Sequence, residues 1–93
     1  MYLLIINEAG NLGDQTTHSL FQTLDQAKKA FKDVAENFIK QTIFDEGLTK
    51  REAKQYRKEC YEADTTHDLI LSCVDTNLEW GVYLRTIKVK GEI

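Results

Sequence analysis

TLDQAKKAFKDVAENFIKQTIFDEG, residues 23–47, is the stretch that decides the fold of this chain. With a turn of about 100° per residue, its apolar side chains fall within one stripe and its charged side chains on the opposite side. The stretch therefore predicts an amphipathic helix from Leu24 to Glu46 that rests on a hydrophobic core. The predicted core stripe comprises Leu24, Ala27, Phe31, Val34, Ala35, Phe38 and Thr42.

Both ends of this helix carry capping signals. Thr23 followed three residues later by Gln26 fits a capping box, in which each side chain accepts a hydrogen bond from the backbone N–H of the other residue. At the far end, Gly47 suits the left-handed conformation of a Schellman motif, and Leu48 would then meet Ile43. The predicted bounds of the helix thus follow from local chemistry.

A second helix is predicted directly after the first. Thr49 and Glu52 repeat the capping-box pattern and open a helix over residues 50–63. Because the link is short, we expect the two helices to be antiparallel neighbours. Ile43 and Phe44 lie off the stripe of the first helix, so we expect them to pack against the second. The apolar line of the second helix is Ala53, Tyr56, Cys60 and Ala63.

The remaining segments predict strands. Tyr2–Ile6 is a continuous apolar run, which is typical of an inner strand buried on both faces. Glu8–Ser19 has the composition of a loop, with a short second strand over His18–Gln22 as an alternative reading of its end. After a turn at 64–68, Leu69–Val74 and Trp80–Val89 are rich in β-branched and aromatic residues. Residues 75–79 between them form a hairpin connection.

This order of elements predicts an α+β fold. We expect one two-layer domain over residues 1–93, with two helices on one face of a mainly antiparallel sheet of three or four strands, in the order β-(β)-α-α-β-β. In the last strand the apolar alternation changes phase after Arg85 and Thr86, which predicts a β-bulge there. The flanking Lys88 and Lys90 suit an edge strand or a protected strand end.

Composition narrows the class of function. Fifteen acidic and twelve basic residues give a formal charge of −3, which argues against a general nucleic-acid binder. The apolar run at residues 1–6 lacks the basic region of a signal peptide, and no stretch is long enough to span a bilayer, so we expect a cytoplasmic protein. We expect Cys60 and Cys73 to be reduced and buried. Whether the two cysteines lie close together stays open.

Motifs for catalysis or metal binding are missing from the sequence. A zinc site built from His18, Cys60, His67 and Cys73 would lack the closely spaced ligand pair that such sites use. Residues 75–79 imitate only the first half of a calcium loop. Cys73 and His67 could form a nucleophile and base, but Cys73 is expected at a core position. We therefore expect no enzyme activity, no cofactor and no metal.

Two surface features are candidates for partner binding. The first is a basic flank of the second helix. Its functional reading is a contact surface for phosphates or an acidic partner, and its alternative reading is a solvated helix face. The second is Tyr83 with Arg85, which alternate with the core residue Trp80 and so point to a sheet face that the helices leave open. Tyrosine and arginine are types enriched at interface hot spots. The basic flank comprises Lys50, Lys54, Arg57 and Lys58, with Tyr61 nearby.

These features favour a small non-enzymatic protein-binding domain that acts as an inhibitor or regulatory adaptor of a larger partner. Size and the lack of catalytic motifs match small accessory proteins of bacteria and phages, of which anti-CRISPR inhibitors are one type, and a nucleic-acid-processing complex would then be the partner. The alternative is a nucleic-acid-binding accessory module that uses the basic flank. A homodimer through the sheet edge or the open face is a further expectation.

Overall fold

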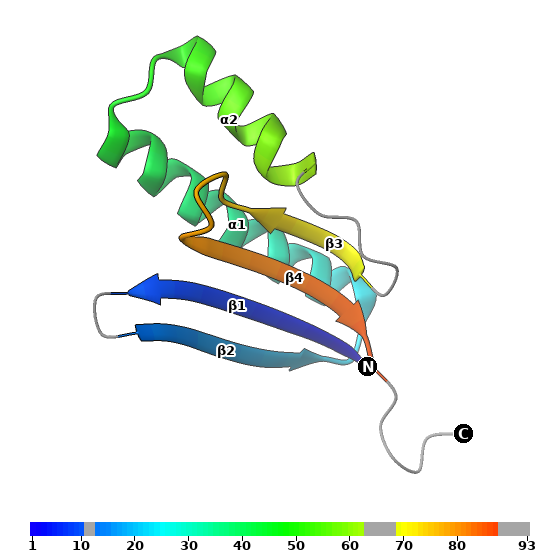
Figure 1. The fold of residues 1–93 in the computed structure, drawn as a ribbon. Coiled ribbons are helices and arrows are strands. Elements are labelled where there is room, and N and C mark those ends of the chain that lie inside the picture. The colour runs from blue at the N-terminus through cyan, green and yellow to red at the C-terminus, as the bar shows by residue number, and fades with distance from the viewer. Residues whose placement is uncertain (11–12, 63–68, 88–93) are drawn as a thin grey trace.

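The computed structural model describes residues 1–10, 13–62 and 69–87. It shows an α+β fold of four strands and two helices in the predicted order (Figure 1). The predicted turn at 64–68, Ala63, Lys88 and Lys90 lie outside the described residues. The elements are β1 (Tyr2–Gly10), β2 (Gly13–Phe21), α1 (Leu24–Glu46), α2 (Lys50–Glu62), β3 (Leu69–Val74) and β4 (Trp80–Thr86).

The four strands form one antiparallel sheet in the order β2-β1-β4-β3. The inner position of β1 confirms the prediction from its apolar run. The edge-strand reading of the last strand is wrong, because β4 lies between β1 and β3. The edges are β2 and β3.

The first hairpin is longer than its composition predicted. β1 continues to Gly10 and pairs without interruption with β2, from Tyr2 opposite Phe21 to Gly10 opposite Gly13. The prediction of a loop over 8–19 is therefore wrong, since Thr16 and Thr17 are β-branched residues that suit a strand. Burial of β1 on both faces is also wrong, because Leu3 and Ile5 on the side away from the helices stay partly exposed.

Among the described strand pairs, one irregularity is present, and it lies in β3. The register with β4 shifts between Leu69 and Leu71, opposite Arg85 and Leu84. The bulge that the sequence predicts in the last strand, beyond Arg85 and Thr86, falls where β4 and then the described residues end, so it stays a prediction. β4 itself pairs evenly with β1 from Trp80 to Thr86.

The predicted limits of α1 and its Schellman end are confirmed, and one of the two hydrogen bonds of the predicted capping box is present. The Gln26 backbone N–H donates to Thr23 Oγ1 at 3.3 Å. At the other end Gly47 is left-handed, with φ 61°. The N–H groups of Gly47 and Leu48 donate to the carbonyls of Phe44 and Ile43 at 3.2 and 3.1 Å, which is the Schellman pattern.

α1 buries part of the predicted stripe and one residue more, while Leu24, Val34, Phe38 and Thr42 are partly buried. Ala27, Phe31 and Ala35 are buried as expected, and Ile39, off the predicted stripe, is buried as well. Ile43 packs at the margin of the core, whereas Phe44 is 81% exposed, so the expectation that both cover the second helix fails for Phe44.

Trp80 fastens α1 to the sheet. Its ring stacks on Phe38 with centroids 5.0 Å apart, and its indole N–H donates to Thr42 Oγ1 at 3.2 Å. A stacked aromatic pair with a hydrogen-bonded indole N–H ties the helix to the sheet. The core cluster comprises Leu4, Ala27, Phe31, Ala35, Ile39, Tyr56, Cys60, Cys73, Trp80, Val82 and Leu84.

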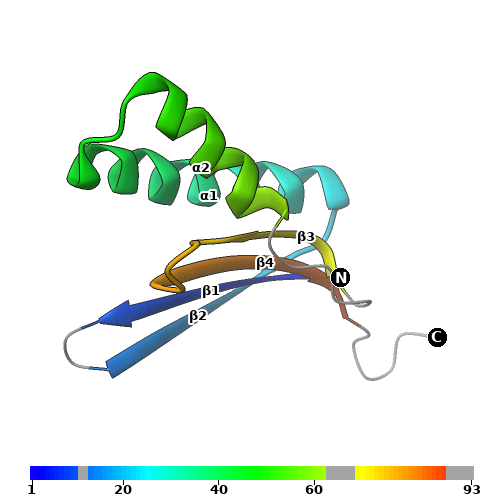
Figure 2. The same ribbon diagram turned by 45° about the horizontal axis from the view of Figure 1, so that its top comes forward.

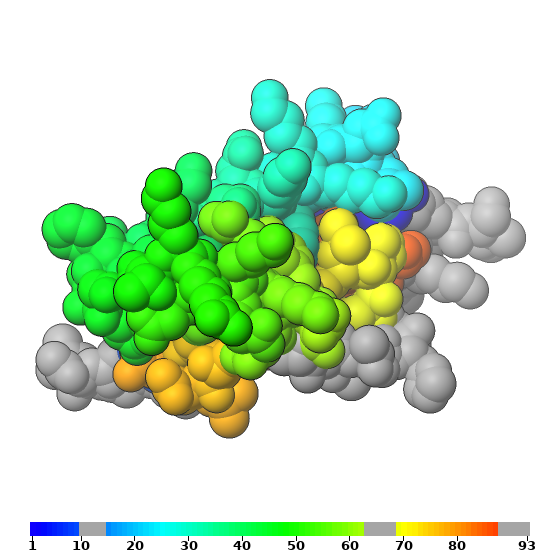
Figure 3. Space-filling model, turned by 90° about the horizontal axis from the view of Figure 1, so that it is seen from above, coloured from blue at the N-terminus to red at the C-terminus, as the bar shows by residue number. Residues whose placement is uncertain are grey.

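The two helices form one layer and the sheet forms the other (Figure 2). Seen from the helix side, α1 and α2 hide most of the sheet, and β3 and the turn after it reach the surface beside them (Figure 3). The opposite face of the sheet bears no described helix. Neither helix combines the length and apolar character needed to cross a membrane.

Candidate partner-binding surface

The sheet face away from the helices is defined by the alternation of β4. Val82 and Leu84 are fully buried under the helices, so Tyr83 and Arg85 project to the other side. The strand register gives this open face three rows across all four strands. From β2 to β3 the rows are Leu20-Leu3-Arg85-Leu69, His18-Ile5-Tyr83-Ser72 and Thr16-Asn7-Gly81-Val74.

Apolar residues occupy the middle of the open face. Leu3 and Ile5 are partly exposed there, and Leu20 on the edge strand is 57% exposed. Arg85 and Tyr83 lie directly beside Leu3 and Ile5 on the neighbouring strand. An apolar centre with an aromatic and an arginine beside it has the composition of a binding hot spot.

Tyr83 lies against Gly81, whose lack of a side chain leaves room for the ring. A Cβ atom placed on Gly81 would lie 2.6 Å from Tyr83 Oη and 2.9 Å from Cε2. The tyrosine ring therefore lies back over the glycine, two residues away on the same strand face. The space above Gly81 on the open face is thus taken by the Tyr83 ring.

The hydrogen bonding of the Arg85 side chain is incomplete within the described residues. Its Nε atom is buried and makes no hydrogen bond to the described residues. Leaving a buried donor unpaired costs about 1–3 kcal/mol. The open face thus contains a cation whose hydrogen-bonding capacity the described part of the fold does not use in full.

A hollow of about 290 Å³ adjoins Tyr83 and Gly81 at one end of the open face. Leu78 lies on its rim and is 76% exposed. Its φ of 59° is in the left-handed region, which costs a residue with a Cβ atom free energy. Sequence reasoning missed Leu78, although an apolar residue within the polar turn 75–79 was a visible signal.

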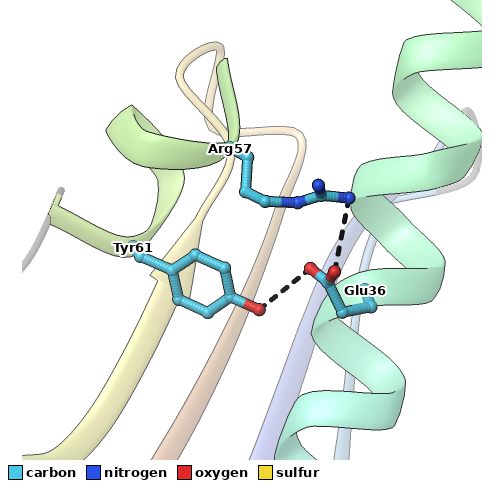
Figure 4. Close-up of polar contacts among 3 residues, drawn as sticks. All are labelled: Glu36, Arg57 and Tyr61. Atoms are coloured by element: carbon cyan, nitrogen blue, oxygen red, sulfur yellow. Dashed lines mark hydrogen bonds and ion pairs between the residues drawn. The ribbon is translucent and has the colours of Figure 1, made fainter. Parts of the chain in front are cut away.

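The basic flank of α2 is divided by its contact with α1. Arg57 and Tyr61 both reach Glu36 (Figure 4). The Arg57 guanidinium lies 3.3 Å from one carboxylate oxygen, and the Tyr61 hydroxyl donates to the other at 3.0 Å. Burial and this hydrogen bond to the carboxylate raise the pKa of Tyr61. These two of the predicted contact residues connect the helices, and Lys50, Lys54 and Lys58 are exposed.

The exposed part of the flank adjoins a cleft of about 1080 Å³ beside α2. Four basic residues and three acidic residues line it, namely Arg51, Lys54, Arg57 and Lys58 with Glu46, Glu52 and Glu59. A phosphate-binding groove needs an excess of positive charge. The mixture of signs in this cleft suits a polar protein surface better than a nucleic-acid backbone.

The cysteines belong to a buried polar cluster between α2 and the β3–β4 hairpin. Cys60 and Cys73 are reduced, fully buried and close enough for their thiols to hydrogen-bond, which lowers the pKa of Cys60 and raises that of Cys73. Next to them the Tyr56 hydroxyl donates to Asp75 Oδ1 at 2.7 Å. Asp75 is only 2% exposed and also accepts from the Glu79 backbone N–H. The cluster joins α2 to the hairpin.

The seven predicted contact residues thus lie on two separate surfaces. Tyr83 and Arg85 are on the open sheet face, and the residues of the basic flank are on the helix layer. His67, the base considered for Cys73, lies outside the described residues. Comparisons of the chain with protein-family models, curated proteins and solved structures gave no match. The functional argument therefore rests on the geometry of these surfaces.

Proposed function

We propose that this chain is a non-catalytic protein-binding domain that inhibits or regulates a larger partner through the open sheet face. One observation carries the proposal: Leu3, Ile5, Tyr83 and Arg85 lie side by side on a face that no described helix covers. Apolar area of this kind gains free energy when a partner removes it from water.

The chemistry of the face indicates what the partner presents. An apolar protrusion would cover Leu3 and Ile5, and a carboxylate or carbonyl oxygen would accept hydrogen bonds from the Arg85 guanidinium. Leu78 and the hollow beside Tyr83 extend the same surface toward the hairpin tip. We therefore expect a folded protein surface with an acidic group beside apolar residues.

A non-catalytic role is supported by where the reactive groups lie. Cys60 and Cys73 are fully buried. The Asp75 carboxylate accepts hydrogen bonds that hold the fold together. A nucleophile or general base must reach a substrate, so these groups suit a structural role.

For the class of partner, we propose a nucleic-acid-processing complex, such as one that a phage-encoded anti-CRISPR inhibitor would block. This finer proposal rests on the small size of the domain and its lack of catalytic motifs. It is an analogy of function class and needs a direct test.

Affinity capture from bacterial lysate, with and without nuclease, tests the binding role. The double variant Tyr83→Ala with Arg85→Ala should lose the partner and keep the circular dichroism spectrum of the native protein. The matched control, Lys54→Ala with Lys58→Ala, changes two exposed residues of the other surface and should keep the partner. Equal capture by both double variants would contradict the proposal.

The nucleic-acid alternative is favoured by one observation, the exposure of Lys50, Lys54 and Lys58 on one helix. It makes a different prediction for the same experiment. Capture would vanish with nuclease, and affinity would fall steeply with salt concentration. The lysine control variant would then be the one that loses binding.

A further inference from the structure

The two edges of the sheet differ in how they are protected from further pairing. β3 has six residues, a register shift and α2 packed beside it. Short length and irregular register are devices by which edge strands avoid other chains. β2 has nine residues and pairs with β1 without any shift.

β2 also lacks the chemical devices that protect an edge. It contains no proline, lysine or arginine. Gln15, Thr16, Thr17 and His18 are all exposed, and none of the described strands lies on the outer side of β2. A long, regular edge without proline, lysine or arginine is a template for another strand.

We propose that β2 pairs antiparallel with β2 of a second copy of this chain, about a two-fold axis at Thr17. Centring the pair on Thr17 lets all nine residues from Gly13 to Phe21 find a partner. Thr17 then lies opposite the partner's Thr17, and Thr16 opposite the partner's His18. The result is an eight-stranded sheet with an isologous interface.

A second copy fits this edge because the edge is complementary to itself. Asp14 is the only acidic residue of β2. In the proposed register Asp14 and the partner's Asp14 are six residues apart along the seam, or about 20 Å. Thr17 opposite Thr17 and Thr16 opposite His18 are polar pairs, so the dimer places no like charges directly across from each other.

The dimer would also enlarge the open face. A two-fold axis perpendicular to the sheet keeps both helix layers on one side and both open faces on the other. Leu20 and Leu3 of each copy then belong to one continuous surface, and a partner with repeated sites would be bound twice. The dimer does not depend on the proposed inhibitor role.

Analytical ultracentrifugation tests the dimer directly. We expect a mass of 21.4 kDa, twice the 10.7 kDa of one chain. Thr17→Lys should halve this mass, because like charges would lie directly opposite at the seam, and Thr17→Glu should halve it too. An equimolar mixture of the two variants should restore the dimer mass. The control Thr76→Lys, at an exposed position of the β3–β4 turn, should leave the dimer intact.

Thr17→Cys provides a second measurement that does not rely on weakening the seam. Directly opposed Cα atoms of antiparallel strands lie about 4.5–5.5 Å apart, which suits a disulfide. Oxidation should therefore produce a covalent dimer, while Cys60 and Cys73 are buried. A wild-type protein that is monomeric at every concentration, or a dimer that survives Thr17→Lys unchanged, would overturn the proposal.

Discussion

At the residue scale, Gly81 controls the position of Tyr83. In Gly81→Ala the new methyl group would occupy the space of the tyrosine ring, so the ring must swing away from the open face. Because only the far end of a flexible side chain moves, we expect the free energy of unfolding to change by less than about 0.5 kcal/mol. Affinity for the captured partner should fall about tenfold or more. If Gly81→Ala bound the partner with wild-type affinity in surface plasmon resonance, Tyr83 would not be an anchor residue of the interface.

Leu78 is the second residue whose conformation suggests a role. Its left-handed backbone costs the free protein stability although its side chain is exposed, and such strain is often retained at functional sites. Leu78→Gly should raise the free energy of unfolding by about 1 kcal/mol in urea titrations, since glycine adopts this conformation without penalty. The same variant should bind the partner more weakly. A lower free energy of unfolding in Leu78→Gly would contradict the backbone strain at Leu78.

At the scale of the elements, Tyr56 decides how firmly α2 is held on the β3–β4 hairpin. Tyr56→Phe removes the hydrogen bond to the buried Asp75 carboxylate, which should cost about 1–3 kcal/mol. The matched control is Tyr61→Phe, which removes a hydrogen bond between exposed groups on the same helix and should cost less than about 0.5 kcal/mol. Urea unfolding of both variants makes the comparison. Equal costs would mean that the buried cluster does not hold α2.

The start of α2 gives a pH dependence. The Thr49 backbone N–H donates to the Glu52 carboxylate, and the Thr49 hydroxyl accepts from the Glu52 backbone N–H. Hydrogen bonding to Thr49, mainly to its backbone N–H, lowers the pKa of the Glu52 carboxyl group. A lowered pKa in the folded state stabilises the protein at pH values above the ordinary pKa of glutamate, and this stabilisation is lost as the pH falls through the lowered value. On acidification, the Glu52→Gln variant should therefore lose less stability than the wild type, as measured by thermal unfolding. If the stability of both proteins fell equally with pH, the role assigned to the Glu52 carboxylate would be contradicted.

Local signals account for the elements that the sequence predicted well. Thr23 and Gly47 limit α1 through hydrogen bonds to residues at most four positions away, and Thr49 with Glu52 does the same for α2. The β1–β2 hairpin was underestimated because Thr16 and Thr17 lie among glycines and polar residues, and only pairing with β1 reveals them as strand residues. Long-range partners are invisible to a local pattern.

Only the part of the candidate site that follows from a local pattern could be predicted from the sequence. Period-two alternation placed Tyr83 and Arg85 on the face opposite Trp80, and the strand register agrees. Nothing near Arg57 or Tyr61 in the sequence indicates that both reach Glu36, which is 21 and 25 residues away. The adjacency of Cys60 and Cys73 likewise depends on how α2 packs on β3.

At the scale of the whole molecule, the two-layer architecture separates two surfaces that one partner cannot easily contact together. The helix layer presents charges of both signs and the partly exposed Arg57–Glu36 ion pair, and such pairs contribute little free energy. The Arg57 Nε atom, like that of Arg85, is buried without a hydrogen-bond partner among the described residues. The sheet layer presents partly exposed apolar side chains and an incompletely satisfied arginine. Burying the sheet face therefore offers the larger gain in free energy.

Hydroxyl-radical footprinting of the complex with the captured partner measures which of these surfaces is covered. Tyr83, Ile5 and Leu20 should become protected from side-chain oxidation on binding, whereas the exposed Phe44 and Tyr61 of the helix layer should react as in the free protein. Protection of Tyr61 and Phe44 with unchanged reactivity of Tyr83 would show that the partner binds the helix layer, and would contradict the role proposed for the open sheet face.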